Sequence, residues 1–218
     1  MRASTNGASA RAAPPPLCHS PAMSPGLCIA ATVAVALGGL SDAELRDVGA
    51  GKIVTRSESF TTATGKSAGR GLGAIIVERP IGDVWATLVR FEDRAEYVPR
   101  IKSVQILERQ PERLRVRQEI DATVTTARYT AWYRLDALTH TISWTLDRDA
   151  RDNTVADVEG DYRLSELAPG RTLLVYRTFV DSGLKVPQSI QSFMQRRAIP
   201  DLLRALKKRV ESGGTFKK

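Results

Sequence analysis

The sequence predicts an α+β fold in which helices cover one face of a single antiparallel sheet. Two observations support this prediction. Apolar and polar residues alternate with a period of two through most of residues 101–180. Residues 188–210 then repeat their apolar side chains at helical spacing. This amphipathic stretch is the only expected element long enough to cover a sheet of that size.

The elements that precede the alternating region are shorter. Residues 52–60 are expected to form an edge strand, and residues 61–73, rich in Thr, Gly and Ser, a loop. Residues 74–79 form a strand that the following proline ends. The apolar spacing of residues 81–91 predicts a helix, and residues 95–98 a further helical turn.

The alternating region itself predicts a meander of six antiparallel strands, because Pro, Gly and polar turns interrupt it at regular intervals. The expected strands are 101–109, 113–121, 124–135, 141–146, 155–167 and 172–180. In the C-terminal helix, Pro200 is expected to kink or restart the helix, and Gly213 and Gly214 to end it.

Composition excludes several function classes. A chain of 218 residues with 42% hydrophobic and 26% charged residues is of ordinary globular type and has room for one domain plus an extension. Both cysteines, Cys18 and Cys28, and one of the two histidines, His19, lie within the first 28 residues. Disulfides, thiolate metal sites and Cys-His dyads are therefore excluded from the rest of the chain. His140 is its only histidine, and we interpret it as a surface turn residue. We expect no metal and no cofactor.

Residues 1–43 are expected to be a signal peptide or a disordered N-terminal extension. Arg2 and Arg11 precede an apolar stretch over residues 27–40, and Ser41-Asp42-Ala43 offers a cleavage site near Ala43–Glu44. We expect an exported protein, periplasmic or secreted. A retained membrane anchor and a cytoplasmic protein are the alternatives, since the apolar stretch is shorter than the ~20 residues of a spanning helix. Residues 44–212 form the expected domain, and residues 213–218 a flexible tail.

A set of short motifs runs in order along residues 72–210. They are Val84-Trp85, Leu88, Phe91-Glu92, Tyr97-Val98-Pro99, Ile101–Val104, Thr130, Tyr133–Leu135, Ile142–Trp144, Glu159-Gly160, Tyr162, Leu164, Gly170–Thr172 and Val186-Pro187. This set resembles the polyketide cyclase/dehydrase and coenzyme Q-binding START-like families of the SRPBCC superfamily. The resemblance implies a helix-grip fold, in which a curved antiparallel sheet of about six to seven strands wraps around a long C-terminal helix and encloses an apolar cavity. Such proteins bind lipids, quinones, sterols or polyketides, and most share no catalytic constellation, so no catalytic residue is transferred.

Strand alternation predicts which side chains face the interior. Small residues among large aromatic ones leave volume for a ligand, while tyrosine hydroxyls and a glutamine can orient it. An ordinary filled core is the alternative. The loop over residues 181–187 is a candidate lid or a plain connector. The expected cavity residues are Trp85, Leu114, Val116, Gln118, Ile120, Tyr129, Ala131, Tyr133, Ile142, Trp144, Tyr162, Leu174, Tyr176, Phe193 and Met194.

The sequence therefore favours non-catalytic carriage or presentation of a hydrophobic small molecule by a monomer. A polyketide cyclase or dehydratase is one alternative, although tyrosine with a pKa near ~10 is a poor base at neutral pH. A macromolecule-binding module that uses the basic C-terminal helix is another. The net charge is +8. We interpret the basic residues as a solvated face with ion pairs, with membrane-surface contact as a possible further role, and we do not expect nucleic-acid binding. The acidic Asp157, Glu159 and Asp161 share an outward strand face, so a cation site is not expected there.

Overall fold

The computed structural model describes residues 39–122, 125–185 and 188–218, and within these ranges the side chains of residues 188–196 are outside the description. The apolar stretch of the expected signal peptide lies almost entirely outside the described residues. The elements are α2 (Asp42–Gly49), β1 (Val54–Thr61), β2 (Ser67–Val77), α3 (Ile81–Leu88), α4 (Arg94–Tyr97), β3 (Ile101–Gln110), β4 (Arg113–Asp121), β5 (Thr126–Asp136), β6 (Thr141–Leu146), β7 (Asp157–Ala168), β8 (Arg171–Asp181) and α5 (Gln188–Glu211).

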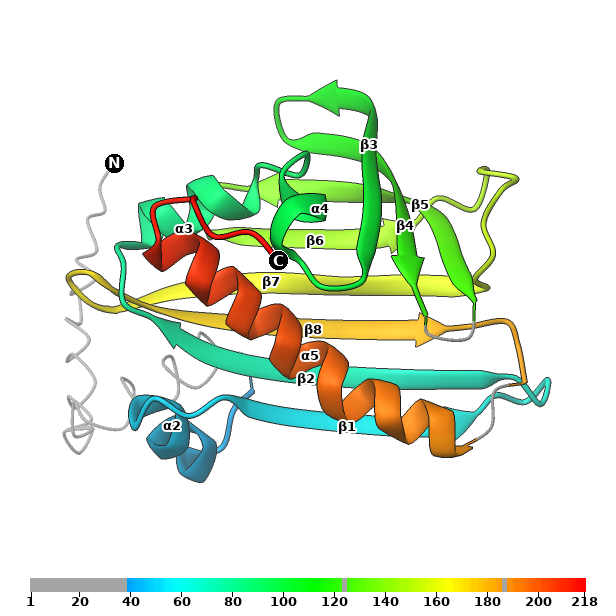
Figure 1. Ribbon diagram of the computed structural model, residues 1–218, viewed down its shortest axis with the longest axis horizontal. Helices are drawn as coiled ribbons and strands as arrows, with labels where there is room; N and C mark the ends of the chain where they lie inside the picture. Colours follow the sequence, from blue (N-terminus) through cyan, green and yellow to red (C-terminus); the bar gives the residue numbers. More distant parts are fainter. Residues whose placement is uncertain (1–38, 123–124, 186–187) are drawn as a thin grey trace, which may run out of the picture.

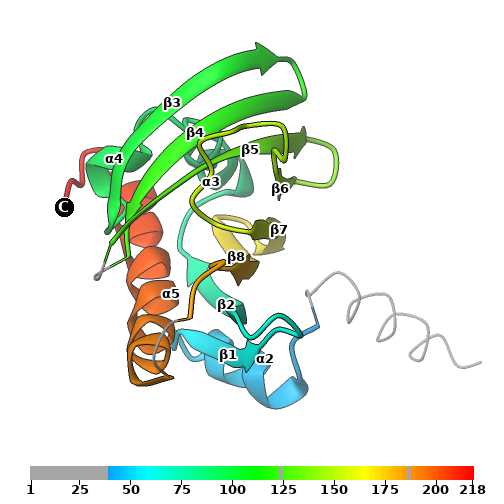
Figure 2. The same ribbon diagram turned by 90° about the vertical axis from the view of Figure 1, so that its right-hand side faces the viewer.

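The strands form one antiparallel sheet of eight strands in the order β1-β2-β8-β7-β6-β5-β4-β3, and the sheet is not closed (Figure 1). It curves around the side on which α5 lies (Figure 2). This arrangement confirms the predicted antiparallel sheet around a long C-terminal helix. The sheet exceeds the expected six to seven strands because both N-terminal strands join it. Helix α5 runs through Pro200 without restarting.

Strand β2 corrects one prediction. Residues 67–73 were expected in a loop, but they pair with both β1 and β8. The glycines that suggested a loop have a packing role instead. A Cβ at Gly71 would lie 2.3 Å from Cδ1 of Ile199, and one at Gly73 would lie 2.5 Å from Cγ2 of the same residue. Because these positions lack side chains, α5 can approach the sheet closely, and pairing on both edges outweighs the low strand propensity of glycine.

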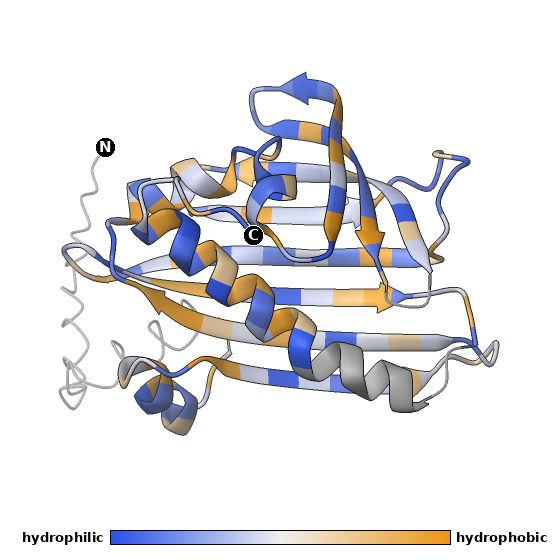
Figure 3. Cartoon of the chain, viewed as in Figure 1, coloured by the Kyte–Doolittle hydropathy of each residue, from blue (hydrophilic) through white to orange (hydrophobic). Residues whose placement is uncertain are grey.

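The main core lies between the concave face of the sheet and the helices. It includes the fully buried side chains of Val84 and Leu88 of α3 and of Leu203 and Leu206 of α5. Figure 3 shows hydrophobic and hydrophilic residues interspersed along the coloured, C-terminal part of α5.

A second, smaller apolar cluster covers the opposite face of β2 and β8. The short helix α2 contributes Val48 to this cluster, and the segment ahead of it contributes Leu40. Both side chains are buried against Ile76 and Leu173. Ser41 caps α2 by accepting a hydrogen bond from the backbone N–H of Glu44, which binds back to Ser41. The packed part of the chain thus begins ahead of the expected boundary at residue 44, and the expected cleavage point falls in the first turn of α2.

The last six residues, expected to be a flexible tail, lie against α4 and the start of β3. The backbone N–H of Lys218 donates to the carbonyl of Glu96 at 3.0 Å, and its Nζ donates to the carbonyls of Val98 and Ile101 at 3.1 and 2.6 Å. Phe216 packs against the main core. Within the described residues, no helix combines the length and apolar character that a membrane crossing requires.

Candidate functional site

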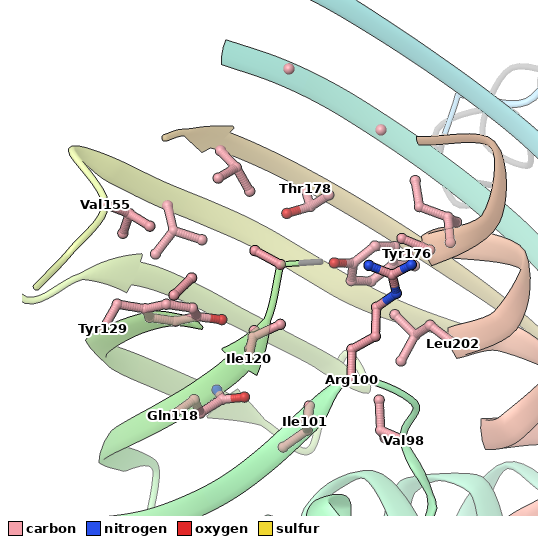
Figure 4. A pocket seen from close by; sticks show the side chains of 18 of the residues that line it. Val98, Arg100, Ile101, Gln118, Ile120, Tyr129, Val155, Tyr176, Thr178 and Leu202 are labelled. Atoms are coloured by element: carbon pink, nitrogen blue, oxygen red, sulfur yellow. The ribbon is translucent and has the colours of Figure 1, made fainter. Parts of the chain in front are cut away.

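A cavity of about 380 Å³ lies between α5 and the concave face of the sheet, toward the end of the sheet away from α3. Residues of all eight strands, of α4 and the segment that follows it, and of the middle of α5 line the cavity. Figure 4 shows Gln118, Tyr129, Tyr176 and Thr178 directing their polar atoms into it, with Leu202 of α5 on another side. The volume lies within the ~300–1,000 Å³ typical of small-molecule sites.

The structure brings seven of the expected cavity residues together in this wall: Gln118, Ile120, Tyr129, Tyr133, Trp144, Tyr162 and Tyr176. The side chains of Phe193 and Met194 are outside the described residues. Six others do not line the cavity, which corrects the prediction for Trp85, Leu114, Val116, Ala131, Ile142 and Leu174. The last five are buried in the main core, since inward alternation specifies burial and not contact with a void.

Trp85 lies elsewhere because Val84 and Leu88 occupy the inner face of α3. Its indole ring contacts the imidazole of His140 edge-on, with ring centroids 5.6 Å apart. His140 adopts a positive φ of 48° in the turn before β6, as a turn residue, and does not line the cavity.

A cluster of aromatic rings forms one side of the cavity. Trp144 lies 5.7 Å from Tyr133, 5.3 Å from Tyr162 and 5.8 Å from Tyr176, measured between ring centroids. The amide Nε2 of Gln118, which is buried, donates to the Tyr133 hydroxyl at 2.5 Å. The wall thus combines large apolar faces with a few fixed hydrogen-bonding groups, as ligand sites do.

The tyrosine hydroxyls of the cavity stay protonated at neutral pH. Burial raises the pKa of Tyr129 and Tyr162 well above the ordinary value, and it raises the pKa of Tyr176 to about 12. Burial also raises the pKa of Tyr133, although Arg94 and the Gln118 amide oppose the shift. These groups can therefore donate and accept hydrogen bonds, but they are not poised to act as general bases.

Arg94 is one of the cavity-wall residues that sequence reasoning missed, and it is the buried charged one. It begins α4, its side chain is buried, and it lines the cavity. Its Nη2 donates to the carbonyl of Leu88 at 3.0 Å. The position follows a Glu-Asp pair at an expected helix end, and such polar runs are usually solvated. The sequence signal that Arg94 is buried, unlike most residues in such polar runs, is the pair of apolar residues on either side of it. Phe91 and Tyr97 are both fully buried.

The basic residues of the outer sheet face are largely paired. Arg115 binds Asp147 at 2.6 Å and Arg117 binds Asp152 at 3.0 Å. Arg113 instead lies over the ring of Trp132, with its guanidinium carbon 3.8 Å from the ring centroid. This is the solvated face with ion pairs that the sequence favours. Among the described residues, no group of three or more His, Cys, Asp and Glu side chains is arranged to hold a metal.

The described part of the candidate lid is hydrogen-bonded to the end of the β1–β2 loop and to the first residue of β2. Ser182 Oγ donates to the carbonyl of Ser67 at 2.8 Å, and Lys66 Nζ donates to the carbonyl of Gly183 at 2.8 Å. Gly183 adopts a φ of 67°, which favours glycine. Residues 186 and 187 of the loop lie outside the described residues, and lid movement stays a prediction.

A family model described as polyketide cyclase / dehydrase and lipid transport matches residues 73–211 of the chain. This range contains the strands and the helix that form the cavity, except for β1 and the start of β2. No curated protein matches the sequence.

Many solved structures have the same fold. The Zhui aromatase/cyclase from Streptomyces sp. R1128 is 20% identical, with 72% of this chain and 94% of that chain covered and a TM-score of 0.55. A START superfamily protein from Mycobacterium smegmatis is 19% identical, with 73% and 97% covered and a TM-score of 0.54. Human StAR-related lipid transfer protein 5 is 15% identical, with 85% and 98% covered and a TM-score of 0.55. At these identities the likeness concerns the fold, and it confirms the predicted helix-grip fold.

Proposed function

The chain belongs to the polyketide cyclase/dehydrase and lipid transport family, and on this premise we propose that it binds a hydrophobic small molecule in its cavity without transforming it. One observation above all supports the proposal. Among the described residues, the wall contains no Asp, Glu, His, Lys or Cys that could transfer a proton or attack a carbonyl at neutral pH. The remaining polar groups are protonated tyrosines, one glutamine, hydroxyls and arginines, which suit binding and orientation.

Burial of apolar surface supplies the expected affinity. Each Å² of apolar ligand area removed from water contributes about 25 cal/mol, so a ligand that fills the cavity needs no covalent or metal bond to be held. The aromatic cluster around Trp144 offers flat faces for a ring system or a chain. Lipids, quinones and polyketide-like rings all have such surfaces.

The test is native mass spectrometry of the full chain purified from its own host without detergent, followed by organic extraction and identification of the bound molecule. We expect a stoichiometric apolar adduct. The variant Ala127→Phe adds a ring at a position that lines the cavity and should lose the adduct. The variant Ala137→Phe adds the same ring in the exposed turn between β5 and β6 and should retain it.

An empty wild-type protein that also fails to take up lipids, quinones and polyketides from a panel would overturn the proposal. Conversion of an added polyketide by the purified protein would replace carriage with catalysis as a cyclase or dehydratase. As part of the same proposal, we place this binding outside the cytoplasm, on the strength of the apolar stretch over residues 27–40. Fractionation of host cells with an antibody against the folded domain tests that location.

A further inference from the structure

The cavity wall has a strongly one-sided charge. Three arginines line it, Arg70, Arg94 and Arg100, and the described part of the wall contains no carboxylate. Arg70 is exposed, and its guanidinium carbon lies 5.4 Å from the ring centroid of Phe60. Arg100 is half-buried and extends its guanidinium into the cavity region in Figure 4. An apolar cavity with this charge distribution attracts negatively charged ligands.

Arg94 is the buried arginine of the three, and it has no ionic partner among the described residues. All 24 Asp and Glu residues of the chain lie in its described part, and none of the ion pairs found there includes Arg94. The two acidic residues nearest to it in sequence bind other cations. Asp93 and Glu96 both bind Arg209, and Glu96 also binds Lys217. The cation is nevertheless 95% buried, since only 5% of Arg94 is exposed.

The protein compensates this buried charge only in part. The guanidinium carbon of Arg94 lies 3.7 Å from the ring centroid of Phe91 and 5.6 Å from that of Tyr162. The backbone carbonyl of Leu88 accepts a hydrogen bond from Nη2, and the Tyr133 hydroxyl is a second, uncharged hydrogen-bond partner of Arg94. A guanidinium has five N–H donors in a planar fork and does not lose its proton in proteins. Burial of such a charge is costly unless an anion pairs with it.

We infer that the cavity takes an acidic apolar ligand, a carboxylic acid with one apolar chain or ring system, and that the carboxylate pairs with Arg94. The inference rests on the proposed binding function and names the class of its ligand. A carboxylate matches the guanidinium fork and can bind it through two parallel hydrogen bonds. The apolar body of the acid would lie against Trp144 and the side of α5 that faces the cavity.

The cavity size favours a single chain over a two-chain phospholipid. The cavity of about 380 Å³ lies near the lower end of the ~300–1,000 Å³ range of small-molecule sites. Decanoate is a small single-chain acid with an ionised head group at neutral pH. Decan-1-ol has nearly the same apolar chain but no charge, and decyl phosphate has the same chain with a phosphate head.

Isothermal titration calorimetry of delipidated full-length protein with these three probes tests the inference. We expect decanoate to bind about tenfold more tightly than decan-1-ol, or better, because hydrogen bonds to charged groups are the stronger ones. Equal affinity for decanoate and decan-1-ol would overturn the inference and leave the carrier proposal standing. Tighter binding of decyl phosphate than of decanoate would overturn the carboxylate assignment. Failure of wild-type protein to bind any of the three would count against both proposals.

Two variants distinguish the effect of Arg94 on ligand binding from the effect of the protein's overall positive charge. Arg94→Met removes the charge and keeps an apolar side chain; it should weaken decanoate binding at least about tenfold and leave decan-1-ol binding within about threefold. Arg113→Met removes the same charge from the outer sheet face, where Arg113 is exposed, and should leave both affinities unchanged. Retention of the decanoate preference in Arg94→Met would show that the head group binds elsewhere.

Thermal unfolding without ligand gives a readout that does not depend on the choice of probe. If Arg94 is held for a ligand, its removal relieves a buried, unpaired charge, and the melting temperature of ligand-free Arg94→Met should rise by roughly 2–4 °C. If Arg94 serves only to anchor the backbone at Leu88, the melting temperature should fall instead, and the inference is overturned.

Discussion

The indole of Trp144 lies directly over Gly160 on the neighbouring strand, so that a Cβ at Gly160 would stand 2.3 Å from Cζ2 of Trp144. The two residues are cross-strand partners in β6 and β7. The absence of a side chain at Gly160 therefore sets the position of the ring that forms the centre of the aromatic cluster.

The first prediction follows from this contact. Gly160→Ala should lower the free energy of unfolding by about 1–3 kcal/mol, because the added methyl group overlaps the indole and the carbonyl of Arg177. Chemical denaturation measures the loss, and Trp fluorescence reports the displaced ring. Gly82→Ala is the control, because a Cβ there meets nothing within 4 Å, and it should stabilise the protein by about 0.4–1 kcal/mol. Wild-type stability in Gly160→Ala would contradict the prediction.

The close approach of α5 to β2 predicts a non-additive pair. A Cβ at Gly73 would lie 2.7 Å from Cδ1 of Leu203. Gly73→Ala should cost about 1–3 kcal/mol by overpacking, and Leu203→Ala about 2–5 kcal/mol by opening a void. The double variant should lose less than the sum by about 0.5–3 kcal/mol, since the new methyl group partly fills the void. Additive losses in urea denaturation would show that α5 does not meet β2 at this point.

Arg209 holds the end of α5 to α4 and to the C-terminal residues. Its guanidinium is buried, binds Asp93 and Glu96 at 3.3 and 3.4 Å, and donates to the carbonyl of Phe216 at 2.9 Å. Arg209→Gln should therefore cost about 1.5–3 kcal/mol. Arg204→Gln breaks an exposed pair with Asp201 and should cost at most about 1 kcal/mol. Equal effects of the two variants on urea midpoints would argue against an anchoring role for Arg209.

The buried tyrosines predict a loss of stability at high pH. The pKa of Tyr176 is about 12 in the folded protein and about 10 in an unfolded chain. The folded state therefore holds this proton more tightly, and the resulting stability is complete below pH ~10 and is lost as the pH rises toward ~12. Between pH 8 and pH 11, Tyr176 should contribute a loss of about 1.4 kcal/mol.

Tyr176→Phe provides the comparison, because phenylalanine has no proton to release. Its unfolding free energy should fall less than that of the wild type over the same pH interval, by about the amount assigned to Tyr176. Parallel pH profiles of the two proteins in urea denaturation would show that Tyr176 titrates normally in the fold.

The outer apolar cluster predicts that the segment ahead of α2 belongs to the folded unit. Leu40 is only 7% exposed, so Leu40→Ala should lower the free energy of unfolding by about 2–3 kcal/mol. Leu138→Ala, at a position that is 96% exposed, should change it by less than about 0.5 kcal/mol. A neutral Leu40→Ala would mean that the segment before Ser41 can be lost without cost.

Local patterns were sufficient to predict the meander from β3 to β8, the helix α3 and the C-terminal helix. In these elements, the apolar residues recur at the spacing that places them on the buried face. Each strand of the meander also pairs with its neighbour in sequence, so local and tertiary preferences coincide. Strand β2 is the exception. Its glycines favour a loop by propensity, and only the helix that lies against them, more than a hundred residues later in the chain, explains why glycine is required there.

The residues of the candidate site also differ in how far the sequence could predict their positions. Alternation indicated that Gln118, Tyr129 and Tyr162 point inward, because side-chain direction in a strand is a local property. It could not distinguish the wall of a cavity from a filled core. That distinction depends on where α3 and α5 place their side chains, and Leu114 and Leu174 lie where those helices fill the space.

The sequence alone therefore determined the class of the fold, the inward faces of the strands and the absence of Cys and of any second His after residue 28, because these depend on composition and on short periodic patterns. Only the tertiary structure decided where the volume remains, that α2 and the last six residues pack onto the domain, and that Arg94 is buried without a counter-ion. Each of these depends on contacts between segments far apart in sequence, and the cost of burying a charge is apparent only when every neighbouring group is known.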